Sequence, residues 1–270
     1  MDTNFINSFY DFQKTGNAWN DLNPLTKLNI CFALALTAVV VHDYRYGVPL
    51  IILACIVAAI AGKFKEFFST FWKISLTLTI FLILIRQIGT RPGNVTPFIN
   101  VFGWQWYLEA FIDALDIITF IMGFSGWMLL YFVTTPMRDL MYVLEKRGMS
   151  HENSFIMLSA MQNIIDLRKA SVTILESQKA RGIETEGNVL VRLKAFFPTL
   201  GPLILGAITS TEEKAIAMDA RAFSVNRKHT FLREIEPMAT AEKVLVGLVW
   251  LYFVATIIYR VYPMISGMFK

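Results

Sequence analysis

Residues Ile117–Val133, IITFIMGFSGWMLLYFV, form an uncharged apolar run near the middle of a chain of 270 residues. A helix needs about 20 apolar residues to cross the hydrocarbon core of a bilayer, with a lower bound of about 17. The run is the clearest membrane span in the sequence. Other apolar runs lie on both sides of it, and a long polar region follows it directly.

Three further apolar runs precede this span, and each is shorter than the usual spanning length. They are Leu28–Val41, Val48–Ala61 and Ile74–Ile85, and the segment Phe67–Trp72 extends the third run at its front across Lys73. Basic side chains at the ends of such short helices can reach the lipid interface. A hairpin that only dips into the membrane remains an alternative for the first two runs.

A last apolar run, Val244–Tyr259, brings the count to about five, and 55% of all residues are hydrophobic. We therefore predict an all-α polytopic membrane protein with long amphipathic cytoplasmic helices. Its predicted parts are an N-terminal transmembrane region of about four spans (1–133), a cytoplasmic region (134–240) and a C-terminal transmembrane helix (241–270). The segment Gly89–Leu108 contains prolines, glycines and tryptophans, which predicts an irregular loop at the lipid interface.

The distribution of lysine and arginine predicts the orientation of the spans. The connection Gly62–Lys73 holds three lysines and region 134–240 holds fourteen basic residues, whereas the 42–47 turn holds one and the 86–110 loop holds two. Basic loops stay in the cytoplasm, so the N-terminus and region 134–240 are predicted inside the cell and the C-terminus outside. The net charge of +4 comes with no basic stripe of interleaved aromatics, so nucleic acid is not an expected partner.

The cytoplasmic region is predicted to be helical. After a short helix Met137–Arg147 closed by Gly148, a helix of about twenty-five residues is expected from around Ser154 to Arg181. Its residues recur at spacings of three and four, which predicts a stripe packed on a partner; the stripe is Leu158, Met161, Ile165, Arg168, Val172, Leu175 and Lys179, widened by Ile164, Leu167 and Ile174.

A second cytoplasmic segment is predicted as two helices with a break between them. A short helix Val189–Phe197 is expected to end at Pro198, and Pro202 is expected to open the next helix. The stripe of that helix is Ile204, Ile208, Thr211, Ala215, Met218 and Ala222.

Both long helices are predicted to end in the same short pattern, Ala180-Arg181-Gly182 and Ala220-Arg221-Ala222. An arginine at a helix C-terminus can simply complement the helix dipole. Lysine would complement the dipole equally well. A capping role also does not explain the small residues on both sides of each arginine. A guanidinium between small residues can approach a partner closely and bind a carboxylate with its planar fork. The repeat therefore predicts two docking tips for acidic grooves on a partner.

These residues resemble the transmembrane T component of energy-coupling factor transporters, a class of ABC importers. The resemblance rests on the two Ala-Arg tips, on Phe197–Leu203 and on Glu212–Asp219. Thr134-Thr135-Pro136 and Asn23–Lys27 are similar to weaker landmarks of the family. The second tip departs from the family pattern, because Ala222 stands where glycine is frequent and alanine adopts a left-handed cap less readily.

The resemblance implies a non-catalytic scaffold in the cell membrane with three kinds of partner. Two cytoplasmic ABC ATPases would each receive one tip, and a small membrane subunit would capture a vitamin, a vitamin precursor or a metal ion. ATP and magnesium would be bound by the ATPases, so no cofactor is expected in this chain. The sequence contains no G-x-x-x-x-G-K-[ST] phosphate-binding loop of its own.

An intramembrane enzyme is the main alternative, with Asp113 and Asp116 as candidate groups three residues apart. His151-Glu152 does not continue into a zinc-binding H-E-x-x-H helix, because Phe155 occupies the second histidine position. The acidic pair Glu212-Glu213 is expected on a solvated face. The two cysteines lack ligand-spaced neighbours, so no metal site is expected. A purely structural or receptor-like membrane protein also remains open.

Overall fold

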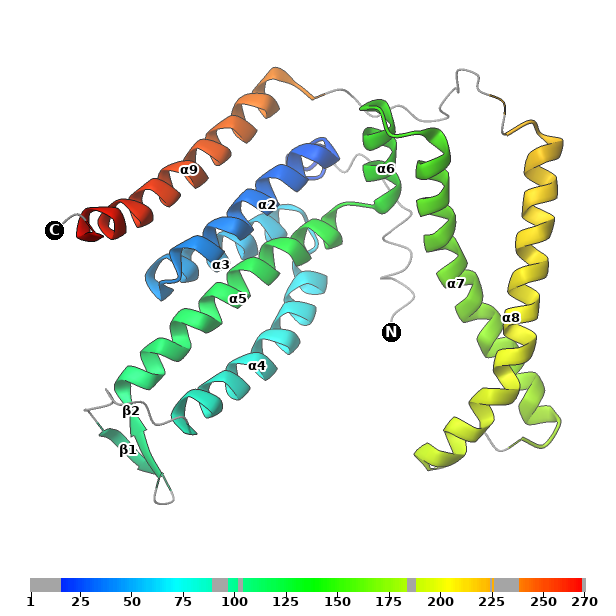
Figure 1. Cartoon of the computed structure of the whole chain (residues 1–270), viewed down its shortest axis with the longest axis horizontal. Coiled ribbons are helices and arrows are strands. Elements are labelled where there is room, and N and C mark those ends of the chain that lie inside the picture. The colour runs from blue at the N-terminus through cyan, green and yellow to red at the C-terminus, as the bar shows by residue number, and fades with distance from the viewer. Residues whose placement is uncertain are drawn as a thin grey trace. The chain divides into compact units, whose positions relative to one another are not determined.

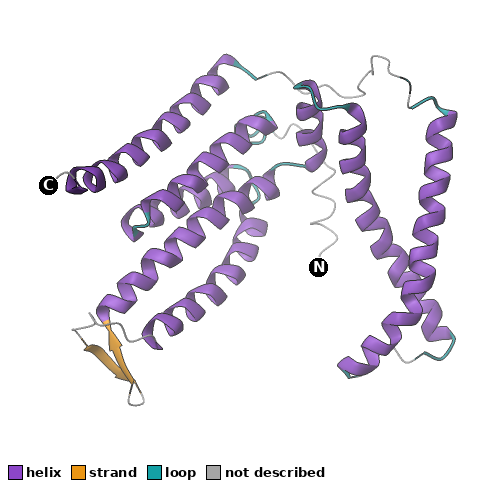
Figure 2. Cartoon of the chain, viewed as in Figure 1, coloured by secondary structure: helices purple, strands orange, loops and turns teal. Residues whose placement is uncertain are grey.

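The computed structural model describes residues 16–88, 97–101, 104–183, 188–223, 225 and 238–268. Helices make up nearly all of this part of the chain, and one short antiparallel hairpin lies between two of them (Figures 1 and 2). The predicted all-α membrane class is confirmed. The chain forms two compact units, residues 1–143 with 235–270 and residues 144–234. The three-part division at residues 133 and 240 stays a prediction.

The first unit is built from apolar helices, and each is longer than the apolar run that predicted it. They are α2 (Pro24–Val41), α3 (Tyr44–Ile60), α4 (Phe64–Ile88), α5 (Leu108–Thr134) and α9 (Thr240–Met268). The division between the two units falls within a short sixth helix, α6 (Met137–Lys146). Within the described residues, α2, α4, α5 and α9 are long and apolar enough to cross a membrane, and α3 is shorter with 17 residues. The predicted extension of the third run across Lys73 is confirmed, because α4 is continuous there.

Helix α5, which contains the central apolar run, is also the centre of the first unit. It packs against α2, α3 and α4 (Figure 1). Its Trp127 and Leu130 side chains are fully buried in the core that these helices share. A Cβ atom added to Gly123 would lie 2.8 Å from the Cβ of Ala38 in α2. Glycine is required at Gly123 because the two helices approach too closely for a larger side chain.

We expect Gly123→Ala to destabilise the protein by about 1–3 kcal/mol, because the added methyl group forces α2 and α5 apart. Gly247 of α9 is a matched control, since a Cβ there would have no atom within 4 Å. Gly247→Ala is expected to be neutral or slightly stabilising, as alanine favours the helix. Thermal unfolding in detergent measures both changes, and equal melting temperatures for the two variants would contradict the close contact.

Contacts along α5 determine the directions of its neighbours. Trp19, which precedes α2, donates from Nε1 to Oγ1 of Thr134 at the end of α5 at 3.4 Å, so α2 runs antiparallel to α5. Helix α4 is also antiparallel to α5, because Gln87 near its end bonds to the backbone of Tyr107 before α5. Helices α2 and α4 are therefore parallel, and α3 carries the chain back between them.

Helix α9 lies beside α2 and runs parallel to it. The Thr26 hydroxyl donates to Glu242 Oε2 at 2.7 Å, and Trp250 Nε1 donates to Asn29 Oδ1 at 3.2 Å. Both helices thus begin at the same end of the first unit. An even number of membrane passes between them brings the chain back to that end, so α2 and α3 either both cross the membrane or together form a hairpin that dips into it.

Buried polar residues gather where α2 and α9 begin. Lys27 is 1% exposed, its Nζ donates to the Asn20 carbonyl at 2.8 Å, and the carboxylates of Asp139 and Glu242 interact with it electrostatically. Asp139 is 3% exposed. A buried ammonium is tolerated only when it is hydrogen-bonded and its charge is compensated, so this cluster joins α2, α6 and α9.

The predicted irregular loop Gly89–Leu108 is wrong in its second half, where the structure has strands β1 (Pro97–Val101) and β2 (Trp104–Tyr107). They pair antiparallel, with Val101 opposite Trp104. The Gln87 side chain donates to the Tyr107 carbonyl and accepts from the Tyr107 N–H, each at 3.0 Å. This amide bridge satisfies backbone groups of Tyr107 at the end of β2. The rest of the predicted loop, residues 89–96, 102 and 103, lies outside the described residues.

The second unit contains two long helices, α7 (His151–Ala180) and α8 (Val189–Ala220). The predicted break at Pro198 is wrong, because α8 continues through Pro198 and Pro202. Each proline removes one backbone hydrogen bond and bends a helix without necessarily ending it. Figure 1 shows that α8 changes direction in its first half.

Candidate partner-binding site

The first tip is the C-terminal end of α7. Arg181 is the C-cap residue and is exposed, as is Ala180. Gly182 takes the left-handed conformation with φ of 86°. Its N–H donates to the Lys179 carbonyl at 2.9 Å, and the Ile183 N–H donates to the Gln178 carbonyl at 3.1 Å. This pair of bonds is a Schellman cap, which fixes the backbone around Arg181.

The second tip has the same geometry at the end of α8. Ala222 adopts a left-handed φ of 56° even though it has a side chain. The Ala222 N–H donates to the Asp219 carbonyl at 3.0 Å, and the Phe223 N–H donates to the Met218 carbonyl at 3.1 Å. Arg221 and Ala220 are exposed. The departure from glycine therefore leaves the cap geometry of this tip unchanged.

A third Schellman cap closes α6, where Gly148 N–H donates to the Glu145 carbonyl at 3.0 Å and Met149 N–H donates to the Leu144 carbonyl at 3.1 Å. Arg147 stands there at the position of Arg181 and Arg221. The cap alone is thus not a docking signal. What separates the two tips from it is the exposed alanine before each arginine, since Lys146 precedes Arg147.

We expect Gly182→Ala to weaken the first cap by about 1–2 kcal/mol, the usual cost of a left-handed residue with a Cβ atom. Ala222→Gly should strengthen the second cap by somewhat less, because glycine also loses more entropy on folding. Hydrogen exchange of the Ile183 and Phe223 amides measures each cap locally. The expected result is faster exchange in the first variant and slower exchange in the second, and an unchanged rate in both would contradict the strain at Ala222.

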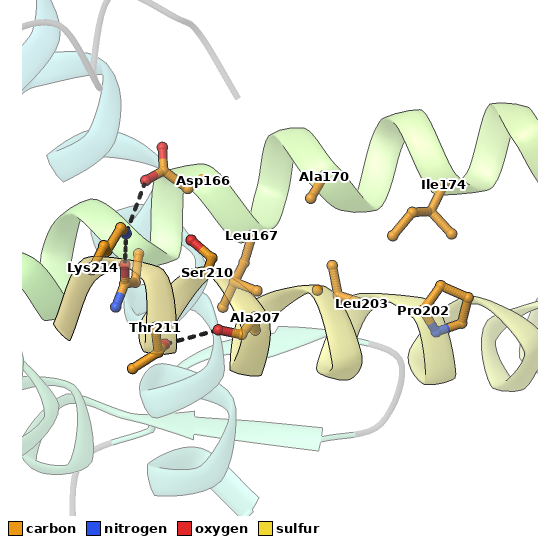
Figure 3. A pocket seen from close by; sticks show the side chains of 12 residues that line it. Asp166, Leu167, Ala170, Ile174, Pro202, Leu203, Ala207, Ser210, Thr211 and Lys214 are labelled. Atoms are coloured by element: carbon orange, nitrogen blue, oxygen red, sulfur yellow. Dashed lines mark hydrogen bonds and ion pairs between the residues drawn. The ribbon is translucent and has the colours of Figure 1, made fainter. Parts of the chain in front are cut away.

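The two helices that carry the tips are antiparallel and cross at one place (Figure 3). Lys214 Nζ donates to Asn163 Oδ1 at 2.8 Å and lies 4.0 Å from Asp166 Oδ2. Beside this polar contact is a cavity of about 250 Å³ lined by residues of both helices, among them Leu167 and Ala170 of α7 and Leu203 and Ala207 of α8. The tips therefore lie at opposite ends of one crossed pair.

Within the second unit, neither predicted stripe is buried along its length. Val172 is 53% exposed and Ile208 is 52% exposed, whereas Leu167 and Ile174, expected only to widen the first stripe, face α8 at the crossing. A stripe with spacings of three and four is buried along its length only when two helices run nearly side by side. Crossed helices touch over a short stretch, so most of each apolar face remains uncovered.

The groups that favoured an enzyme have structural partners or lie exposed. Asp116 Oδ1 accepts the Tyr44 N–H at 2.8 Å and so caps the start of α3, while Asp113 is exposed. Glu212 and Glu213 are exposed. In the described ranges of the chain, His, Cys, Asp and Glu side chains form no group of three that could hold a metal.

Two groups of contacts were not predicted from the sequence, one near the second tip and one in the first unit. His151 Nδ1 lies 2.7 Å from Glu145 Oε1, and its ring lies 5.2 Å from the ring of Phe223. The cluster around Lys27 was not predicted either, although Asn23–Lys27 is similar to a landmark of the family. The contacts of His151 with Phe223, and of Lys27 with Asp139 and Glu242, join residues far apart in the chain, so local spacing gives no signal of them.

The comparisons with known proteins agree over nearly the whole chain. The family model CbiQ, described as a cobalt transport protein, matches residues 16–230. The chain is 27% identical over 270 residues to the energy-coupling factor transporter transmembrane protein EcfT of Limosilactobacillus fermentum, which covers 93% of this chain and 97% of the relative.

Two further relatives carry the same name. EcfT of Bacillus subtilis is 26% identical over 237 residues, covering 84% of this chain and 89% of the relative. EcfT of Staphylococcus aureus is 38% identical over 87 residues, which cover 32% of each chain. With its apolar helices, the chain is a membrane protein and belongs to the CbiQ family, the transmembrane T components of energy-coupling factor transporters.

Proposed function

We propose that this chain transmits ATP-driven motion from two cytoplasmic ABC ATPases to a separate membrane subunit that captures the substrate. The observation that supports this most is the pair of exposed arginines, Arg181 and Arg221, held in identical caps at opposite ends of α7 and α8. Each guanidinium offers five donors to an acidic groove on one ATPase. In this proposal ATP and magnesium are bound by the ATPases, and the chain itself is not an enzyme.

The crossed helices are suited to carry movement between the tips and the rest of the complex. Helices of 30 and 32 residues are about 45–48 Å long at 1.5 Å per residue. A hydrogen bond from Lys214 to Asn163 joins the helices at their crossing, and a displacement of one tip would be carried along its own continuous helix to the opposite arm. Closure of two ATPases around nucleotide would thus change the angle or the position of both arms.

The uncovered apolar faces of these helices are the proposed docking surface for the capture subunit. Contiguous exposed apolar surface of this kind marks a protein or lipid interface. The exposed residues include Ile156, Ile164, Val172, Phe196, Phe197, Ile204, Leu205, Ile208 and Ile216. The substrate class proposed for that subunit is a vitamin, a vitamin precursor or a metal ion, the last in keeping with the family description.

The proposed location is the cell membrane, with the N-terminus and residues 134–240 in the cytoplasm. Lys63 between α3 and α4, together with Lys65 and Lys73 in the first part of α4, supports this orientation. The parallel arrangement of α2 and α9 supports a common side for the start of both helices, and the lysines indicate that this side is the cytoplasm. A C-terminal tag should be reached by a membrane-impermeant label from outside intact cells, and labelling only after lysis would overturn the orientation.

The proposal is tested by the composition of the complex that a tagged version of this chain retains in detergent. Native mass spectrometry should find two ATPase subunits and one small membrane protein per chain. Reconstitution of that complex in liposomes should give ATP-dependent uptake, and omission of any subunit should abolish it. A chain that purifies alone and still transports or catalyses would contradict the proposal.

A further inference from the structure

The two tips differ in the residue that follows the cap. At the second tip this residue is Phe223, and at the first tip the same place is taken by Ile183. In a Schellman cap the side chain at this position usually packs back on its own helix. Phe223 instead contacts the other helix of the pair, so the end of α8 is fastened to the start of α7.

The contact is made by aromatic rings. The Phe223 ring centroid lies 5.2 Å from that of His151 and 4.8 Å from that of Phe155. His151 and Phe155 are one helical turn apart in α7 and so present their rings on the same face. Tilted ring pairs at these distances have favourable geometry. Phe223 thus rests on a platform of two rings.

The platform itself is held in place. His151 Nδ1 lies 2.7 Å from Glu145 Oε1, and the Glu145 side chain is 12% exposed. The Ser150 side chain accepts the Asn153 N–H at 3.3 Å and caps the start of α7. The ring platform is therefore fixed from the turn that precedes α7 as well as from the helix.

Arg221 is close enough to Phe223 in the chain to depend on this contact. Arg221, Ala222 and Phe223 share one cap, and Arg221 and Phe223 line the same open cavity of about 660 Å³ together with Phe155. Because Ala222 is held at a left-handed φ of 56°, the direction of the backbone between the arginine and the ring is fixed.

We propose that Phe223 is the positioning residue of the second tip: seated on His151 and Phe155, it sets the direction in which Arg221 meets its partner. The first tip has an aliphatic residue in this place and cannot use such a ring contact. The two ATPase contacts are then unequal, the second being coupled to the start of α7. This inference rests on the proposed function of the arginines.

The test uses the complete complex and measures how strongly the tagged chain retains the ATPases and how fast it supports uptake. Phe223→Ala is expected to weaken retention about three- to tenfold, the range expected for lost ring contacts. Ile183→Ala is the matched control at the first tip and should have a much smaller effect. Phe223→Tyr, which keeps the ring, should restore retention.

The background in which Phe223→Ala is introduced separates positioning from general stability. In an Arg221→Ala chain, Phe223→Ala should add nothing, since the group that it positions is gone. In an Arg181→Ala chain it should retain its full effect. Equal effects in both backgrounds would show a structural role only and overturn the inference.

A second variant guards against misfolding of the tip itself. Phe155→Leu removes one ring of the platform from the α7 side and should show the same dependence on Arg221. If neither arginine affects retention, the proposed function fails. If Arg221 matters and both Phe223→Ala and Phe155→Leu leave retention unchanged, only the present inference fails.

Discussion

Charge reversal at both tips, Arg181→Glu together with Arg221→Glu, is expected to release the ATPase subunits and to reduce uptake to background. Loss of one buried, hydrogen-bonded charge pair at an interface costs about 2–5 kcal/mol. The tips lie at opposite ends of α7 and α8, so their losses should add to about 4–10 kcal/mol. Even the lower figure corresponds to a loss of affinity of about a thousandfold.

Retention of ATPases by the tagged chain in detergent and ATP-dependent uptake in cells measure this effect. Lys169→Glu is the control, because Lys169 is an exposed basic residue in the middle of α7. It changes the charge of the same helix without touching a tip. Unchanged assembly and unchanged uptake in the double variant would contradict the docking hypothesis.

The conservative pair Arg181→Lys with Arg221→Lys distinguishes recognition from capping. Lysine complements a helix dipole as well as arginine does. It lacks the planar fork that binds a carboxylate through two parallel bonds. A docking role therefore predicts weakened assembly with unchanged exchange of the cap amides, whereas a capping role predicts that both stay at the wild-type level.

Lys27→Met is expected to destabilise the first unit by about 3–5 kcal/mol, the cost of removing one partner from a buried charge cluster. The change removes the positive charge that compensates the Asp139 and Glu242 carboxylates. Thermal unfolding in detergent and the yield of monodisperse protein measure the loss. Lys65→Met, at an exposed lysine, is the matched control and should melt as the wild type does.

A second substitution tests whether charge compensation is the cause. Lys27→Met combined with Glu242→Gln removes one of the carboxylate charges near Lys27 and keeps an acceptor for the Thr26 hydroxyl, which donates to Glu242 at 2.7 Å. This double variant should recover part of the lost stability. If it melts lower than Lys27→Met alone, packing of the lysine stem and not charge balance accounts for the effect.

Local patterns in the sequence were sufficient to predict the apolar helices and the two tips. The central run Ile117–Val133 lies in α5, the helix against which α2, α3 and α4 pack, because an uncharged run of that length has few alternatives to a membrane helix. The arginines were found from their repeat, and the glycine or alanine after each one is left-handed, as a helix stop requires.

The errors came from features that depend on contacts distant in the chain. Pro198 was expected to end a helix. A proline weakens only one turn, and the hydrogen bonds of the neighbouring turns keep α8 continuous. The apolar stripes were expected to be buried along their length. The angle at which two helices cross cannot be predicted from the sequence of either helix alone. Phe223 and His151 are 72 residues apart, and only the antiparallel arrangement brings their rings together.

The pairing of α9 with α2 determines the order in which the protein can be completed during synthesis. Thr26 and Glu242 are separated by 216 residues, so at about 5–20 residues per second the ribosome needs roughly 10 to 45 seconds to supply the second partner. Both arginine tips are made within that interval. A nascent chain therefore exposes both tips before α9 has been made and can pack on α2. A chain that stops after Arg221 would carry both tips on a membrane unit that lacks α9.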